Sequence, residues 1–160
     1  MSEPRPASPP PTTPRGCTNF KLRKLLRRVS RLYDAELAQA GLKTTQFSLL
    51  SHLLQPGPMT PGLLARQLDM DPSTLTRNVQ LLVERGWVEY GPGRDTRSRS
   101  LSLTAAGRAK FDAAKTHWKR AQRALNAQLG VAQVAALHAL LDVATATLET
   151  PEPPPPEDHA

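Results

Sequence analysis

The chain has 160 residues and a mass of 17.5 kDa, enough for one compact domain that buries its apolar surface without disulfides or metal ions. Its single cysteine excludes an intrachain disulfide framework, and we expect a cytoplasmic protein without membrane association, because we find no signal segment or long apolar run. The net charge of +7 and the pI near 10.2 point to a polyanionic partner, most commonly nucleic acid.

Proline marks the two ends of the chain. Residues 1–16 and 151–160 together hold 11 of the 16 prolines. We expect both segments to be disordered tails, because proline-rich polar segments supply few backbone donors and little apolar surface. A binding motif for a partner is the alternative interpretation. The segment expected to fold as one domain, residues 17–150, carries a net charge of +9.

Two helices are predicted first. Apolar residues recur at helical spacing from Asn19 to about Ala40, and Gly41 follows as a stop signal. A second helix follows Thr44. Its dense apolar run predicts burial on most sides, and residues 55–58 are expected to end it.

Two short helices joined by the three-residue turn 69–71 are predicted next. Thr60 is a typical N-cap with Pro61 at the first helical position, and Asp71 and Pro72 repeat this arrangement for the following helix. Two short helices connected in this way indicate a helix-turn-helix.

A hairpin and two longer helices complete the prediction. Residues 87–90 and 100–103 alternate as strands around a polar, arginine-rich loop, which predicts a basic two-stranded wing. Thr104 is expected to cap a long fifth helix, and after Gly130 a sixth helix repeats apolar residues in a narrow seam. The expected fold is mostly α (α+β winged helix), with six helices and a two-stranded β-wing.

The fourth helix carries short polar residues on its first two turns, although better helix formers exist. Small hydroxyl side chains and the positive helix N-terminus permit close approach to phosphates, while an arginine or amide reaches base edges. We therefore predict nucleic-acid contacts by Ser73, Thr74, Thr76, Arg77, Asn78 and Gln80. Arginines at a wing tip can enter a minor groove. The predicted wing contacts are Arg94, Asp95, Arg97 and Arg99, with Asp95 orienting Arg97.

Four segments share their order and spacing with a known family. Residues 71–77, 82–88, 95–97 and 103–107 read DPSTLTR, LVERGWV, DTR and LTAAG. Together they resemble the MarR family of bacterial transcription regulators, over about residues 19–148. In this resemblance Arg97 matches the wing arginine of the family and Asp95 matches its acidic partner.

The resemblance implies an obligate homodimer with interleaved terminal helices that grips a pseudo-palindromic double-stranded DNA operator. Family members usually repress transcription and release DNA when a small, often aromatic or anionic, effector binds between the dimerisation and DNA-binding regions. Residues 44–104 then form a winged lobe, and residues 17–43 and 105–150 form dimerisation helices. The first, fifth and sixth helices are also too long for the winged lobe to cover, which independently favours an intertwined homodimer.

The effector and redox assignments leave alternatives open. Six basic residues without an acid between residues 21 and 31 form either a solvated face or the edge of an anion-binding cleft. The candidate pocket residues are Arg23, Arg27, His52 and Trp118, and core packing is the alternative for His52 and Trp118. Some family members sense organic hydroperoxides through a cysteine inside the first helix. Cys17 lies about half a turn before that position, so a redox sensor and an incidental thiol both stay open.

Other classes of function are disfavoured. The chain shows no glycine-rich nucleotide loop and no nucleophile–base pair, so we do not expect an enzyme. Its histidines have no partners at metal-ligand spacing, so we expect neither a structural metal nor a cofactor. The prediction is a sequence-specific, DNA-binding repressor released by a small effector. A thiol-based regulator and a protein-binding winged-helix module are the alternatives.

Overall fold

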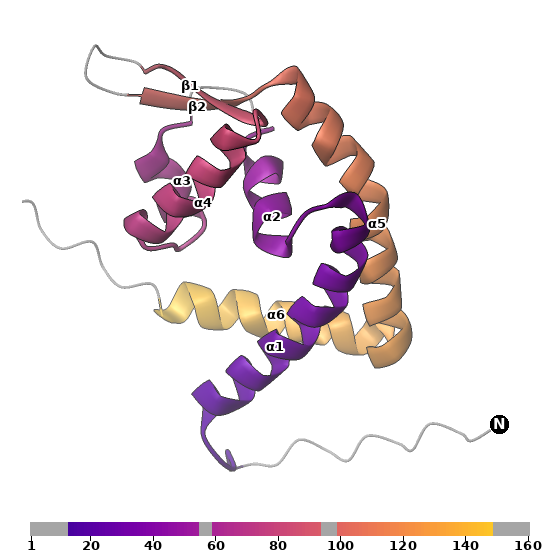
Figure 1. The fold of residues 1–160 in the computed structure, drawn as a ribbon. Helices are drawn as coiled ribbons and strands as arrows, with labels where there is room; N and C mark the ends of the chain where they lie inside the picture. The colour runs from indigo at the N-terminus through magenta and orange to yellow at the C-terminus, as the bar shows by residue number, and fades with distance from the viewer. Residues whose placement is uncertain (1–12, 55–58, 94–98, 149–160) are drawn as a thin grey trace, which may run out of the picture.

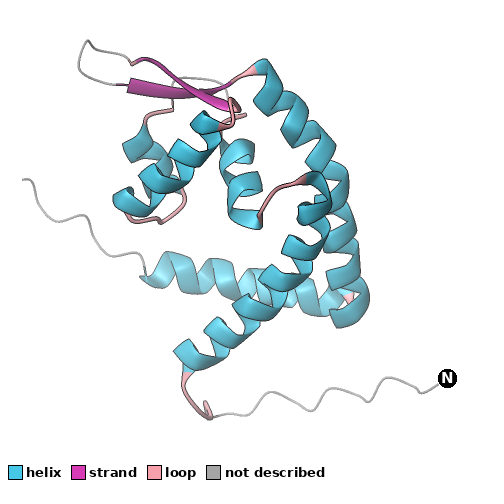
Figure 2. Ribbon diagram, in the orientation of Figure 1, coloured by secondary structure: helices cyan, strands magenta, loops and turns pink. Residues whose placement is uncertain are grey.

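The computed structural model describes residues 13–54, 59–93 and 99–148. Most of the predicted N-terminal tail, the whole predicted C-terminal tail, the predicted helix end at 55–58 and the predicted wing residues 94–98 lie outside the described residues. The chain forms six α-helices, one 3-10 turn and one antiparallel hairpin within the described residues (Figures 1 and 2). The elements are α1 (Thr18–Leu37), η1 (Ala38–Ala40), α2 (Thr44–His52), α3 (Pro61–Gln67), α4 (Pro72–Glu84), β1 (Val88–Pro92), β2 (Arg99–Leu103), α5 (Ala105–Leu129) and α6 (Val131–Leu148).

The end of the first helix confirms the role predicted for Gly41. The α-helix gives way to the tighter turn η1, and Gly41 then adopts a left-handed φ of 65°, which costs glycine little. Leu37, in the last turn of α1, is fully buried. The first helix therefore ends in the core, close to where its sequence predicts.

The helix-turn-helix is confirmed with its two predicted caps. The Thr60 hydroxyl accepts a hydrogen bond from the backbone N–H of Leu63 at 3.2 Å, and Pro61 opens α3. Asp71 caps α4 in the same way, and between the two helices Asp69 adopts a positive φ of 48°. Because the turn 69–71 between the two capped helices is so short, it fixes the direction of α4 relative to α3.

The core of the winged lobe is filled by aliphatic side chains from every one of its helices. Leu50 of α2, Leu64 of α3 and Leu82 of α4 have no exposed surface. On α4, Leu75 and Val79 are also buried, so one complete side of this helix faces the core and its other side is left outward.

The hairpin differs from its prediction by one residue at each strand start. β1 begins at Val88 rather than Trp87 and extends to Pro92, which pairs with Arg99 at the start of β2. Trp87 belongs instead to the turn after α4: its N–H donates to the Leu82 carbonyl at 2.9 Å, and its own carbonyl accepts from Thr104. The bond to Leu82 places the N–H of Trp87 in the turn that ends α4, while its carbonyl pairs with Thr104 in continuation of the hairpin register.

The start of α5 explains the Leu-Thr-x-x-Gly pattern. The Thr104 hydroxyl donates to the Gly86 carbonyl at 2.6 Å and accepts from the N–H of Gly107 at 3.0 Å. A Cβ atom on Gly107 would overlap the Trp87 carbonyl oxygen, so only glycine fits there. This junction connects the winged lobe to the long helix that descends from it (Figure 1).

The sixth helix is apolar on more sides than the predicted narrow seam. The seam residues Leu137 and Leu141 face a cavity beside α1 of the same chain, while Leu140 and Val143 on another side are 70% and 67% exposed. The expectation that the chain has no long apolar run is also wrong. Helix α6 is long and apolar enough to cross a membrane, with a mean hydropathy of 1.5 over 18 residues, because alanine, leucine and valine dominate it. One such helix is weak support for a membrane span, and a helix–helix interface needs the same side chains.

Candidate nucleic-acid interface and ligand cavity

The N-terminus of α4 is held by one carboxylate. Asp71 accepts hydrogen bonds from the backbone N–H groups of Ser73 and Thr74, at 2.9 and 3.1 Å, and from the Ser73 hydroxyl at 2.6 Å. The Ser73 hydroxyl contributes most to lowering the pKa of Asp71, followed by the two backbone donors. The carboxylate therefore satisfies orphan donors at the helix start and fixes the direction of the first turn.

The polar residues predicted on α4 lie on its outward side. Ser73, Thr74, Thr76, Arg77 and Gln80 are exposed, and Asn78 is half-buried. The structure thus brings the predicted contact residues onto a single solvent-facing surface, opposite the buried residues of the same helix.

Several of these side chains already donate hydrogen bonds inside the helix, which sequence reasoning missed. The Thr76 hydroxyl donates to the Pro72 carbonyl, and the Asn78 amide donates to the Thr74 carbonyl, both at 2.8 Å. Bonds to the carbonyl four residues earlier are typical of short polar side chains in helices. Arg77, which is long and exposed, is consequently the best-placed donor on this surface.

The wing presents one of its predicted cations within the described residues. Arg99 is exposed, and its guanidinium lies 5.7 Å from the centre of the Tyr90 ring across the hairpin. Arg94, Asp95 and Arg97 lie outside the described residues, and their contacts stay predictions. The hairpin itself is anchored at the middle of β2, because the N–H of Leu101 donates to the Met59 carbonyl at 2.7 Å.

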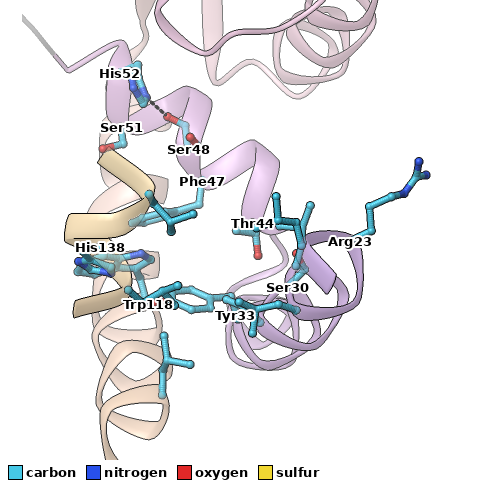
Figure 3. A pocket seen from close by; sticks show the side chains of 17 residues that line it. Arg23, Ser30, Tyr33, Thr44, Phe47, Ser48, Ser51, His52, Trp118 and His138 are labelled. Carbon is cyan, nitrogen blue, oxygen red and sulfur yellow. Dashed lines mark hydrogen bonds between the residues drawn. The ribbon is translucent and has the colours of Figure 1, made fainter. Parts of the chain in front are cut away.

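A cavity of about 660 Å³ lies between α1, α2, α5 and α6 (Figure 3). The predicted pocket residues Arg23, His52 and Trp118 line it, whereas Arg27 is not among its lining residues. Arg27 lies one turn along α1 and farther from the apolar side of that helix. The Arg23 side chain points away from the cavity in Figure 3.

The cavity walls are mainly aliphatic and aromatic. Phe47 stacks on Trp118 with ring centroids 6.1 Å apart, and both line the cavity. The Tyr33 hydroxyl donates to the Gln122 side-chain oxygen at 2.5 Å, and burial raises the pKa of Tyr33. Sequence reasoning missed Phe47 and Tyr33, although their apolar helical periodicity had placed both on inward faces.

His52 supplies a defined polar group on the cavity wall. Its Nδ1 lies 2.8 Å from the Ser48 carbonyl oxygen, and a carbonyl can only accept, so Nδ1 carries the proton. In the neutral ring Nε2 is then a hydrogen-bond acceptor. His52 therefore lines the cavity with its Nδ1 already bonded within α2.

Cys17 is exposed at the N-cap position of α1, and its side chain makes no capping hydrogen bond. It is not among the residues that line the cavity. The structure therefore keeps Cys17 apart from Tyr33 and the other lining side chains, and its redox assignment stays a prediction.

The order of elements, the two-helix turn and the following hairpin define a winged helix-turn-helix protein. A family model described as the MarR family matches residues 40–98. The HTH-type transcriptional regulator YwoH of Bacillus subtilis is 31% identical over 86 residues, which cover 54% of this chain and 63% of that relative, less than two thirds of its length.

Solved structures extend the likeness to the long helices. The transcriptional regulator MosR of M. tuberculosis, solved in complex with DNA, is 30% identical with a TM-score of 0.72, and the match covers 84% of this chain and all of that one. A mutant MarR from E. coli, solved with operator DNA, is 26% identical with a TM-score of 0.73 and covers 79% of this chain and 91% of that one. The chain belongs to the MarR family.

Proposed function

We propose that this chain is a sequence-specific, double-stranded DNA-binding regulator that represses transcription and is released from its operator by a small effector. The observation that carries the proposal is the outward polar side of α4, fixed by the Asp71 cap and backed by a fully buried side. Arg77 is exposed there and can reach a base edge while the helix N-terminus faces phosphate. The structures of MosR with DNA and of the E. coli MarR mutant with operator DNA support this assignment.

A homodimer through α1, α5 and α6 is part of the proposal. In the single chain, Leu26 of α1 is 65% exposed, and Val131, Leu140 and Val143 of α6 are between 67% and 70% exposed. Apolar surface of this extent on long helices is typical of a helix–helix interface. Twofold symmetry then presents two α4 helices to a pseudo-palindromic site with half-sites about one DNA turn, or about 34 Å, apart.

The cavity between α1, α2, α5 and α6 is the proposed effector site. Its volume of about 660 Å³ lies within the usual range for small-molecule sites. The stacked Phe47 and Trp118 favour a planar, largely apolar ligand. Because the Arg23 side chain points outward, the lining supports an aromatic effector better than a purely ionic one.

DNA binding is tested with Arg77→Ala on an operator duplex selected by footprinting the upstream region of the gene. Removing a hydrogen bond to a base edge costs about 1–3 kcal/mol, so we expect affinity to fall about 10- to 100-fold and discrimination at one position to relax. Arg120→Ala on α5, also exposed and cationic, is the matched control and should leave the preference intact. Equal operator affinity in Arg77→Ala and the parent would contradict the proposal.

The effector site is tested through tryptophan fluorescence. The chain has two tryptophans, and only Trp118 lines the cavity, so Trp87→Phe isolates its signal. We expect phenols and other aromatic compounds that bind to change Trp118 emission and to weaken operator binding over the same concentration range. A panel that releases DNA without changing Trp118 emission would place the effector elsewhere.

A further inference from the structure

The first half of α1 carries a strongly charged surface that lies apart from the predicted DNA contacts. Residues 21–31 contain six cations and no acid, and all six are exposed. Among the described residues none of the six forms an ion pair, and their one side-chain hydrogen bond runs from Arg31 Nε to the Arg27 carbonyl within the helix. These residues, called the basic face of α1, are Lys21, Arg23, Lys24, Arg27, Arg28 and Arg31.

The basic face and the cavity lie on opposite sides of α1. At about 100° per residue, the six cations fall within one half of the helix circumference. The other half holds Leu22, Leu25 and Val29, which line the cavity. Arg23, the cation nearest the cavity, points away from it in Figure 3. The basic face is therefore available to a partner outside the molecule rather than to a ligand inside the cavity.

The winged lobe has no comparable excess of charge. Residues 44–104 contain six arginines and five acidic residues, a net charge of +1. Residues 17–43 and 105–150 together carry a net charge of +8. Since phosphate contacts supply much of the affinity of proteins for duplex DNA, most of the charge available for such contacts lies outside the lobe that reads sequence.

The spacing of the basic face suits a duplex. Residues 21–31 span about 15 Å of helix at about 1.5 Å per residue, which gives about one positive charge per 2.5 Å. Duplex DNA carries about one negative charge per 1.7 Å of its axis. We propose that the basic face of α1 is a second contact surface for the phosphate backbone of duplex DNA. It adds sequence-independent affinity to the preference set by α4, and so rests on the proposed DNA-binding function.

The test is a charge-neutralised full-length variant, Lys24→Gln/Arg27→Gln/Arg28→Gln/Arg31→Gln. The matched control, Arg108→Gln/Lys115→Gln/Lys119→Gln/Arg123→Gln, removes the same charge from exposed positions of α5. Both are measured by fluorescence anisotropy on the operator and on a random duplex of equal length, between about 50 and 200 mM salt. Circular dichroism and thermal melting establish that both variants are folded, and sedimentation establishes that both keep the oligomeric state of the parent, because α1 and α5 belong to the proposed dimer interface.

We expect the α1 variant to lose about tenfold or more in affinity on both duplexes alike. The slope of log affinity against log salt concentration should become shallower by about 0.9 for each phosphate that the variant no longer neutralises. The α5 control should keep the parent salt dependence. Identical changes in the two variants would overturn the proposal in favour of net charge acting at long range. An unchanged α1 variant would also overturn it. Failure of the proposed function is distinct, because Arg77→Ala would then keep full operator preference.

Discussion

The winged lobe and the long helices α1, α5 and α6 differ in how fully one chain buries their apolar side chains. In the lobe, Leu50, Leu64 and Leu82 have no exposed surface, so its core is closed without a partner. On α6, Val134 is the one buried side chain, and Leu140 remains 70% exposed. The core of the lobe is therefore closed within one chain, with Leu37 of α1 and Phe111 of α5 as part of it, whereas the long helices also carry apolar surface that a second subunit would cover.

The same two regions also differ in charge. The lobe is nearly neutral and presents a few polar groups in fixed positions, such as the Ser73 hydroxyl on the Asp71 cap. The long helices carry most of the positive charge, and this charge lies along their sides. Under the two proposals above, recognition of sequence falls on the lobe and sequence-independent affinity falls on the long helices.

The largest expected effect distinguishes the buried core of the lobe from the exposed apolar side of α6. Leu82→Ala removes a side chain with no exposed surface, and we expect it to lower the free energy of unfolding by about 2–5 kcal/mol. Leu140→Ala removes an equal volume from the exposed side of α6 and should instead weaken dimerisation. Urea unfolding measures the first change, and sedimentation at several protein concentrations measures the second.

The comparison fails if the two variants behave alike. Loss of stability in Leu140→Ala that does not depend on protein concentration would mean that α6 is stabilised within its own chain. A dimer dissociation constant unchanged by Leu140→Ala would remove this side of α6 from the proposed interface.

A smaller effect is expected where the lobe meets α5. Gly107→Ala places a methyl group against the Trp87 carbonyl oxygen, and the required backbone shift should cost about 1–3 kcal/mol. Gly62→Ala is the matched control, because no atom lies within 4 Å of its added Cβ in α3. Helix propensity predicts that this control gains about 0.5–1 kcal/mol.

Thermal melting of the two glycine variants checks both the expected loss of stability and the expected gain. Opposite shifts of the melting temperature would confirm that the junction, rather than helix propensity, determines the residue at 107. An unchanged melting temperature for Gly107→Ala would show that the turn at Trp87 relaxes freely and does not fix the wing relative to α5.

Local rules predicted most of the fold. Caps and prolines placed α3 and α4, and Gly41 placed the end of the first helix, because each of these signals acts within one turn of chain. The strand start at Val88 was missed by one residue because the N–H of Trp87 donates to the Leu82 carbonyl in the turn that ends α4. An alternating sequence pattern does not show where such a turn gives way to the strand.

The candidate site was predictable to a different degree in its two parts. The outward side of α4 follows from helical periodicity alone, so the exposure of Ser73, Thr74 and Arg77 needed no tertiary information. The cavity needed the relative placement of four helices, and the sequence placed Arg27 there with Arg23 although only Arg23 lines it. The internal bonds of Thr76 and Asn78 depend on side-chain rotamers, which periodicity does not set.

The smallest expected effect concerns the Asp71 cap and its response to pH. Hydrogen bonds from Ser73 and Thr74 lower the pKa of Asp71 in the folded chain, so the carboxylate stabilises the fold above its unfolded pKa of about 3.9. That contribution is lost as the pH falls through the lower, folded pKa. Asp71→Asn keeps a capping oxygen but cannot titrate. We therefore expect the melting temperature of the parent to exceed that of Asp71→Asn near pH 6, and the difference to shrink below about pH 4. A difference that persists unchanged to pH 2.5 would show that the charge of Asp71 does not stabilise α4, and that hydrogen-bond geometry alone holds its start.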